Sequence, residues 1–230
     1  VSYFLDNFST GNRGAGLVEN FIMRDQDQQS AVKYYVVYFH RRGGSCAMPF
    51  ARHLPDAPKQ LDLLSKGNRS IDFSDYLKET PSPEVLSRYL LCLDFTNVTE
   101  YLSSLEQIAR AVNPLGRRAA LVLAAAVSDF YVPPEEMPEN KIQSGEHQQD
   151  GLTLYLKGVP KILGRLKSSW CPESLVVSFK LETDPKILFD KASGAIKKYG
   201  VDAVVANVLE SRYKELWIVR GPGGEDRYSV

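Results

Sequence analysis

Net charge is the first property that this 230-residue sequence lacks, because its 28 Lys and Arg residues balance 28 Asp and Glu residues. Dedicated nucleic-acid binders and polybasic membrane binders carry a clear basic excess, so the balance argues against both classes. Long apolar runs are also missing. The longest, Ala119–Val127, spans nine residues, about half of the roughly 18 that cross a bilayer. We therefore expect a soluble protein that binds neither nucleic acid nor a membrane.

Cysteine and histidine are scarce as well. The three cysteines, Cys46, Cys92 and Cys171, are widely spaced and form no CxxC pair. We therefore expect no disulfide framework, and we expect reduced thiols in a cytoplasmic protein. None of the three histidines has another ligand type four positions away, which disfavours a zinc site. We assign no residue as a metal ligand.

Short apolar runs dominate what the sequence does contain. Hydrophobic residues make up 43% of the chain and charged residues 24%, proportions that are typical of a globular protein. The runs are rich in β-branched residues, and segments with helical periodicity separate them. The predicted strands are Lys33–His40, Tyr89–Phe95, Ala119–Ala125, Leu175–Phe179, Ala203–Ala206 and Glu215–Val219. Several are apolar on both faces, as strands covered by helices on each side must be.

Two intervening helices have clear boundary signals. Asn97, followed three residues later by Glu100, resembles a capping box. Asp184 and Pro185 are typical of an N-cap and a first helical residue, and Gly200 is typical of the residue that ends a helix. Strands that alternate with helices predict a doubly wound, mostly parallel α/β sheet of the Rossmann-like kind.

One polar stretch interrupts this alternation. Val132–Asp150 holds three prolines and many polar residues, and the alternating leucines of Leu152–Leu156 predict a strand after it. A polar segment of this length inside a compact domain is usually a lid or a disordered excursion. We therefore expect a single domain, residues 1–230, with a lid or excursion at about residues 132–157.

A glycine-bearing turn, Asp6–Ala15, precedes an amphipathic helix. Gly11 and Gly14 would let backbone N–H groups approach a phosphate at the helix N-terminus; an ordinary tight turn is the alternative. The turn resembles the TGxxxGxG turn of nicotinamide-dependent short-chain reductases, one residue short. That family's Tyr-x-x-x-Lys pair is absent, as is a GxxxxGKS or GxxxxGKT phosphate loop. A nicotinamide-dependent reductase stays an alternative.

Polar or small residues follow several predicted strands, at the edge where open α/β sheets bind ligands. Ala124–Ala126 and then Asp129 follow the third strand, Phe179 and Lys180 end the fourth, and Asn207 ends the fifth. Each has an ordinary alternative: close helix packing for the alanines, a core position for the phenylalanine and a turn cap for the asparagine. Their convergence on one edge favours a binding site. We assign Lys180 no role.

Lys141 lies in the polar excursion. An exposed loop lysine is usually a solvated charge. The alternative is a lid cation above an anionic pocket, where exclusion of water strengthens its effect on phosphates.

Six motifs together, in order and spacing, resemble the phosphopantothenate–cysteine ligase family, also called phosphopantothenoylcysteine synthetase, of the eukaryotic type. These motifs are Phe4–Ala15 (FLDNFSTGNRGA), Leu123–Pro133 (LAAAVSDFYVP), Lys141–Gly145 (KIQSG), Val159–Lys161 (VPK), Ser178–Asp184 (SFKLETD) and Val204–Arg212 (VVANVLESR). The resemblance implies condensation of 4′-phosphopantothenate with L-cysteine through an acyl-adenylate, with ATP giving AMP and pyrophosphate. It also implies Mg²⁺, a cytoplasmic homodimer with a dimerisation strand, and the second step of coenzyme A synthesis from pantothenate.

The resemblance also assigns site residues by motif. Nucleotide binding is implied for Ser9, Gly11, Gly14, Phe179 and Asn207, phosphopantothenate binding across a dimer interface for Asn7, Ala125, Ala126 and Asp129, and catalysis for Lys141 and Asn7.

Two departures from the family pattern accompany the resemblance. Relatives carry an amino-terminal strand and a Gly-Gly-Thr turn before the FLDNFS motif, and this sequence starts after them. Members often have Arg where this chain has Tyr3, and a tyrosine hydroxyl cannot replace that charge on a phosphate. Arg13 is a candidate substitute. Tyr3 also keeps open a third hypothesis, a nucleotide-binding protein without catalysis.

Overall fold

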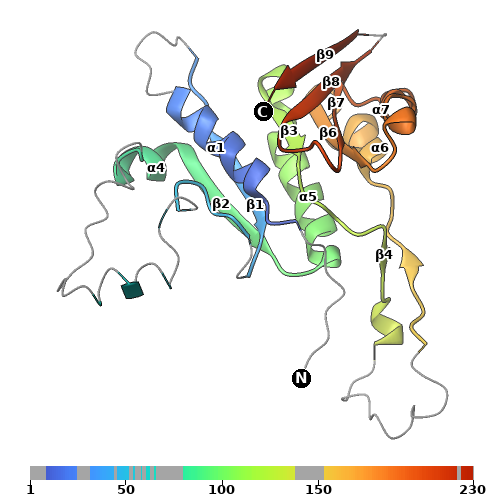
Figure 1. The fold of residues 1–230 in the computed structure, drawn as a ribbon, viewed down its shortest axis with the longest axis horizontal. Coiled ribbons are helices and arrows are strands. Elements are labelled where there is room, and N and C mark those ends of the chain that lie inside the picture. The colour runs from blue at the N-terminus through green and yellow to red at the C-terminus, as the bar shows by residue number, and fades with distance from the viewer. Residues whose placement is uncertain are drawn as a thin grey trace, which may run out of the picture. The chain divides into compact units, whose positions relative to one another are not determined.

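The protein was analysed as a computed structural model, which describes residues 9–24, 32–43, 46–51, 54, 58, 61–62, 65, 80–137, 153–221 and 224–229. These residues belong to two compact units (Figure 1), an amino-terminal unit within Phe8–Thr96 and a carboxyl-terminal unit from Asn97 onward. No helix among the described ranges is long and apolar enough to span a membrane.

In the described ranges of the amino-terminal unit, two parallel strands lie with two well-described helices. Its elements are α1 (Asn12–Arg24), β1 (Val36–Arg41), α4 (Pro83–Tyr89) and β2 (Leu90–Phe95). Ala15, Val18 and Ile22 of α1 recur at helical spacing and are buried against Tyr38 of β1 and against Phe50. This apolar stripe fixes α1 on the core of the unit.

The carboxyl-terminal unit is built on a five-stranded sheet. Its elements are α5 (Val98–Val112), η1 (Asn113–Arg118), β3 (Ala120–Leu123), β4 (Phe130–Tyr131), η2 (Pro134–Glu136), β5 (Lys157–Gly158), α6 (Leu163–Arg165), η4 (Leu166–Trp170), β6 (Leu175–Glu182), α7 (Pro185–Tyr199), β7 (Ala203–Val208), β8 (Glu215–Arg220) and β9 (Gly224–Ser229). The strand order is β3-β6-β7-β8-β9; β3, β6 and β7 are parallel, and β8 and β9 are antiparallel additions. The predicted α/β class with a mostly parallel sheet is confirmed.

One face of this sheet is covered by α7. Val204 and Ala206 of β7 share a face and are fully buried, as are Leu188 and Ala192 of α7. The register places Trp217 of β8 beside Ala206, and its ring meets the ring of Phe189 from α7 edge-on at 5.7 Å. All six residues of β7 are buried, as its central position in the sheet requires.

The predicted helix boundaries are confirmed. The side chain of Asn97 accepts from the backbone N–H of Glu100 at 2.9 Å, and that of Asp184 accepts from Lys186 at 2.9 Å. Gly200 ends α7 with a φ of 70°, a left-handed conformation that glycine adopts without steric cost.

The six predicted strands are present, but each differs from its prediction by one to three residues at one or both ends. Two of these differences bear on the predicted site. The strand Ala119–Ala125 ends at Leu123, because the N–H of Ala124 turns back to the carbonyl of Val122 at 3.1 Å and leaves the ladder. The strand Leu175–Phe179 continues to Glu182, because pairing with β7 persists to that residue. Phe179 therefore lies inside β6 instead of at its end. Asn207 likewise has Val208 after it in β7.

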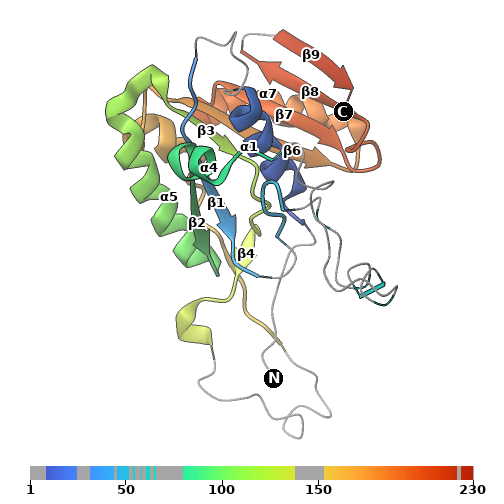
Figure 2. The same ribbon diagram turned by 90° about the vertical axis from the view of Figure 1, so that its left-hand side faces the viewer.

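The strand predicted over Leu152–Leu156 is also wrong where the structure describes it. Residues 153–156 belong to no strand, and the two-residue β5 after them pairs antiparallel with β4. β4, η2 and β5 form an arm that leaves the five-stranded sheet (Figure 1, Figure 2). Residues 138–152 of the predicted lid lie outside the described residues.

Candidate functional site

The carboxyl ends of β3, β6 and β7 form a common edge, because these adjacent strands run parallel. We call it the carboxyl edge; it comprises Ala124–Asp129, Phe179–Glu182 and Asn207–Leu209. The backbone N–H of Leu209 donates to the carbonyl of Glu182 at 2.9 Å, which joins the ends of β6 and β7. Five predicted site residues of this unit are thereby brought to one side of the sheet. They are Ala125, Ala126, Asp129, Phe179 and Asn207.

Phe179 and Asn207 point to the same face of the sheet. Phe179 is opposite Val205 in the register, and Asn207 follows Val205 by two residues. Asn207 is fully buried and Phe179 is half-buried. An aromatic ring and an amide on one face of a sheet edge can bind a base and a ribose, and these roles stay a prediction.

Asp129 is held from two sides by the segment that follows β5. The backbone N–H of Val159 donates to its carbonyl at 2.9 Å, and Nζ of Lys161 donates to its Oδ1 at 2.6 Å. The hydrogen bond and charge of Lys161, aided by the charge of Lys180, lower the pKa of the exposed Asp129 carboxyl. The carboxylate is therefore ionised at neutral pH. Ala125 and Ala126, exposed in the turn before it, leave the backbone open to a ligand.

Glu182 is a residue of the carboxyl edge that the sequence reasoning missed. Its carboxylate lies 3.3 Å from Nζ of Lys180 and 3.1 Å from Nζ of Lys191, and its side chain is 12% exposed. The missed signal was the motif Ser178–Asp184, in which a glutamate closes an otherwise largely apolar strand. Lys191 could not be paired with it from sequence, because α7 must first fold back over β6.

The glycine turn belongs to the amino-terminal unit. Gly11 has a φ of 73°, and its carbonyl accepts the first helical hydrogen bond from Ala15 at 3.0 Å. Gly14 lies within the first turn of α1, so only Gly11 shapes the turn itself. As at every helix start, the first-turn N–H groups have no acceptor within the helix, and they suit an anion.

A second turn supports this glycine turn. The backbone N–H of Ala47 donates to the carbonyl of Thr10 at 2.7 Å, and the hydroxyl of Tyr38 donates to the carbonyl of Ala47 at 2.7 Å. A Cβ on Gly11 would lie 3.3 Å from Sγ of Cys46. Burial, above all, raises the pKa of the Tyr38 hydroxyl. It therefore stays protonated and able to donate.

Several predicted residues cannot be placed from the structure. Asn7, Lys141 and Tyr3 lie outside the described residues. Ser9, Gly11 and Gly14 belong to the amino-terminal unit, and their common site with the carboxyl edge stays a prediction. Arg13 lies half-buried in the first turn of α1.

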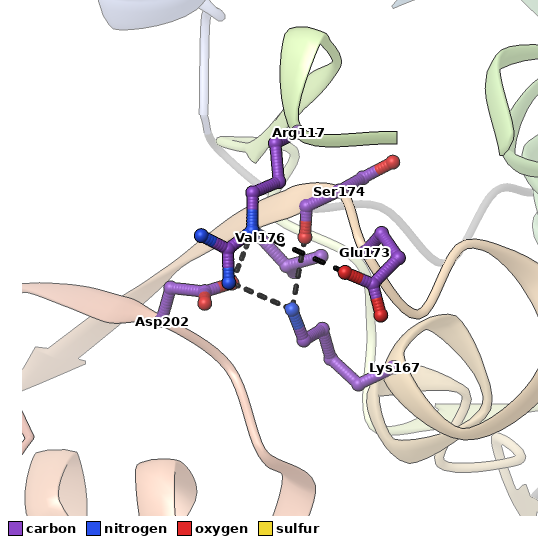
Figure 3. A network of polar contacts seen from close by, with 6 residues as sticks. All are labelled: Arg117, Lys167, Glu173, Ser174, Val176 and Asp202. Atoms are coloured by element: carbon purple, nitrogen blue, oxygen red, sulfur yellow. Dashed lines mark hydrogen bonds and ion pairs between the residues drawn. The ribbon is translucent and has the colours of Figure 1, made fainter. Parts of the chain in front are cut away.

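A second polar network lies at the opposite edge of the sheet, where β6 and β7 begin (Figure 3). Nζ of Lys167 donates to Oδ2 of Asp202 at 3.0 Å and to the carbonyl of Ser174 at 2.9 Å, and the N–H of Val176 donates to the same Oδ2 at 2.8 Å. The network joins η4 to the starts of two strands. This is a structural contact, remote from the carboxyl edge.

Possible metal ligands do not cluster in the described part of the chain. Among the described residues, no group of three His, Cys, Asp or Glu side chains could hold a metal ion. Mg²⁺ in nucleotide-using enzymes is bound largely by substrate phosphates, with one or two carboxylates. Mg²⁺ therefore stays a prediction, as a metal that would arrive with the nucleotide.

The fold and the carboxyl edge define an α/β protein that presents its predicted binding residues at the ends of parallel strands. Residues 94–216 match the family described as the DNA/pantothenate metabolism flavoprotein C-terminal domain. This match runs from the end of β2 to the start of β8, and so includes the whole carboxyl edge.

Two named relatives identify the family within this class more closely. The human protein named phosphopantothenate–cysteine ligase is 39% identical over 229 residues, which cover 94% of this chain and 69% of the human one. Phosphopantothenate–cysteine ligase 2 of Oryza sativa subsp. japonica is 39% identical over 97% of this chain and 70% of its own length. The chain belongs to the phosphopantothenate–cysteine ligase family.

Solved structures agree with this membership. A Cab2 mutant in complex with phosphopantothenate-cysteine superposes with a TM-score of 0.82 at 34% identity, over 99% of this chain and 74% of that one. The similarity covers both units of the chain.

Proposed function

We propose that this protein condenses 4′-phosphopantothenate with L-cysteine, at the expense of ATP. The similarity to the human and rice ligases over more than nine-tenths of the chain carries the proposal. The carboxyl edge supports it, because it places small, amide and carboxylate residues together at the end of a parallel sheet. The product named in the Cab2 complex is the compound that this reaction would form.

The reaction has two steps. The carboxylate of phosphopantothenate attacks the α-phosphorus of ATP and forms an acyl-adenylate, and the bond to pyrophosphate breaks. The amine of cysteine then attacks the acyl carbon, loses a proton and forms the amide, and AMP leaves. Both steps bring anions together, so the protein contributes chiefly positioning and charge neutralisation.

Each candidate residue has a task in this scheme. The first-turn N–H groups after Gly11 bind the triphosphate, supported by Ser9 and Gly14, and Phe179 and Asn207 bind base and ribose. In the phosphopantothenate site, the ionised Asp129 accepts hydrogen bonds from hydroxyl or amide groups, beside Ala125 and Ala126. Asn7 donates to the acyl group without adding charge, and Lys141 brings a cation over the reacting centre. Mg²⁺, when bound with the nucleotide, neutralises phosphate charge.

An assay of product and pyrophosphate tests the proposal. Purified protein with ATP, Mg²⁺, cysteine and phosphopantothenate should form phosphopantothenoylcysteine, detected by mass spectrometry, and one pyrophosphate for each product. Omission of phosphopantothenate should abolish pyrophosphate release. Nucleotide binding without any product would favour the non-catalytic hypothesis, and binding of NADPH in place of ATP would favour a reductase.

Assembly as a homodimer is part of the proposal. The arm presents exposed apolar side chains, Phe130, Leu154 and Tyr155, which a second copy of the chain would cover. Light scattering of the purified protein should give twice the mass of the 25.8 kDa chain, and Phe130→Asp should shift the mass toward the monomer. A monomeric wild-type protein would reject this assembly. The cytoplasmic location and the single-domain organisation of residues 1–230 stay predictions.

A further inference from the structure

The charge cluster around Glu182 contains a lysine for which the proposed roles have no task. Glu182 is nearly buried and lies within 3.3 Å of the ammonium group of Lys180 and within 3.1 Å of that of Lys191. Two ammonium groups thus share one carboxylate, and the trio carries one net positive charge. Only the carboxylate is nearly buried; the side chains of Lys180 and Lys191 are 38% and 48% exposed, so both ammonium groups stay accessible to an anion.

The trio lies at the carboxyl edge. Lys180 and Glu182 belong to the end of β6, and Lys191 contacts both oxygens of Glu182 from α7. Backbone pairing of Leu209 with Glu182 fixes the position of the carboxylate. Asp129, which follows the neighbouring strand β3, lies close enough to be influenced by the charge of Lys180. Lys180 therefore belongs to the same sheet edge as the predicted phosphopantothenate residues, because β3 and β6 are parallel neighbours.

We propose that Lys180 binds phosphoryl oxygens of an anionic substrate and that Glu182 is the residue that positions it. This inference rests on the proposed function, in which two phosphorylated substrates meet at the carboxyl edge. Cations are needed there, because an anion must attack an anion.

Two pairs of ligands, each with and without its phosphate groups, show which of the two substrates Lys180 binds. Calorimetry compares ATP with adenosine and phosphopantothenate with pantothenate, for the wild-type chain and for Lys180→Met, which keeps an unbranched apolar stem of similar length. Affinity for one phosphorylated ligand should fall about 10-fold or more, while affinity for its unphosphorylated counterpart stays unchanged. Lys180→Arg, which restores a cation, should bind that ligand within about threefold of the wild type.

Two further variants separate positioning from folding. Glu182→Gln removes the carboxylate that positions Lys180 but also adds one positive charge, so it should lower the affinity for the same phosphorylated ligand less than Lys180→Met does. In Lys180→Met it should lower that affinity no further, because the residue that Glu182 positions is gone. Lys197→Met removes an exposed lysine from the last turn of α7, at the other edge of the sheet, and should bind both ligands like the wild type.

Unchanged affinity, within about twofold, of folded Lys180→Met and Lys180→Gln for both phosphorylated ligands would overturn the inference. Circular dichroism establishes that the variants are folded. Binding is measured without turnover, so a wild-type protein that binds but forms no product would reject the proposed function and leave this test valid.

Discussion

The carboxylate of Asp129 shows how one contact sets the charge of a binding residue. Lys161 donates to it at 2.6 Å, although both side chains are largely exposed. Exposed ion pairs contribute little to stability. Here the consequence is ionisation, because the lowered carboxyl pKa keeps Asp129 an acceptor at any pH where the enzyme would work.

Lys161→Met should therefore raise the carboxyl pKa of Asp129 toward its ordinary value, as measured by NMR titration. A carboxyl pKa that is lowered in the folded state stabilises the fold above the unfolded-state pKa, and this stabilisation is lost as the pH falls through the folded-state pKa. The acid limb of phosphopantothenate binding should move to higher pH in the variant. Lys157→Met is the matched control, because its partner is Glu135, and it should leave Asp129 unchanged. If the carboxyl pKa of Asp129 were the same in Lys161→Met as in the wild type, the hydrogen bond between Lys161 and Asp129 would be refuted.

Gly11 and Gly14, which the sequence pattern treats alike, should respond oppositely to alanine. Gly11→Ala forces a φ of 73° on a residue with a Cβ, and that Cβ would lie 3.3 Å from Sγ of Cys46. We expect the free energy of unfolding to fall by about 1–2 kcal/mol. Gly14→Ala places a Cβ at an ordinary contact distance of 3.5 Å from the ring of Tyr38. Because alanine favours a helix more than glycine does, the free energy of unfolding should rise by up to about 1 kcal/mol. Urea unfolding measures both. A Gly11→Ala variant as stable as the wild type would mean that Gly11 is not left-handed, and a destabilised Gly14→Ala variant would mean that its Cβ does not fit against Tyr38.

At the scale of elements, the network around Asp202 joins η4 to β6 and β7 (Figure 3). Oδ2 of Asp202 accepts both from Lys167 and from the backbone of Val176. Hydrogen bonds that involve a charged group contribute more to stability than neutral ones do. Loss of the Asp202 charge would therefore weaken both of its hydrogen bonds. The network should therefore stabilise the fold without affecting the carboxyl edge.

Asp202→Asn should lower the free energy of unfolding by about 1–2 kcal/mol, measured by urea denaturation, and leave both substrate KM values unchanged. Glu173→Gln is the control, since its contact with Arg117 is 4.0 Å long and exposed, and it should cost less than about 0.5 kcal/mol. A raised KM in Asp202→Asn would show that the two edges of the sheet are coupled.

How far the sequence predicts these elements depends on whether their signals are local. The helix starts at Asn97 and Asp184 follow from side chains that accept from their own turn, and the end at Gly200 follows from its lack of a side chain, which permits a left-handed φ. The sequence identified all three. The extension of β6 to Glu182 depends on its pairing with β7, which no local pattern contains. The polar β9, Gly224–Ser229, is a strand only because β8 pairs with it, and the sequence analysis missed it.

The candidate site divides in the same way. Ala125, Asp129 and Asn207 could be found from sequence, because parallel strands bring their carboxyl ends to one edge whatever the details of packing. Their partners could not. The contacts of Lys161 with Asp129 and of Lys191 with Glu182 join residues 32 and 9 positions apart, and depend on how the arm and α7 return to the sheet.

At the scale of the whole molecule, a homodimer with shared sites makes a prediction that no monomer makes. If each site takes its nucleotide residues from one chain and its phosphopantothenate residues from the other, Asn207→Ala and Asp129→Ala damage different halves of a site. Each variant alone should be nearly inactive. In a mixed dimer one site would then carry both defects and the other neither, because the two chains are related by a twofold axis.

Mixing the two inactive variants under conditions that exchange subunits should therefore restore about a quarter of wild-type activity, because random pairing makes half of the dimers mixed and each mixed dimer has one intact site. The measurement is pyrophosphate release before and after exchange. Mixing Asn207→Ala with Phe179→Ala is the control; both variants damage the nucleotide half of the site, so every site in their mixed dimers carries one defect and no activity returns. Activity that stays absent in the first mixture, with exchange verified by mass spectrometry, would place both halves of each site in the same chain.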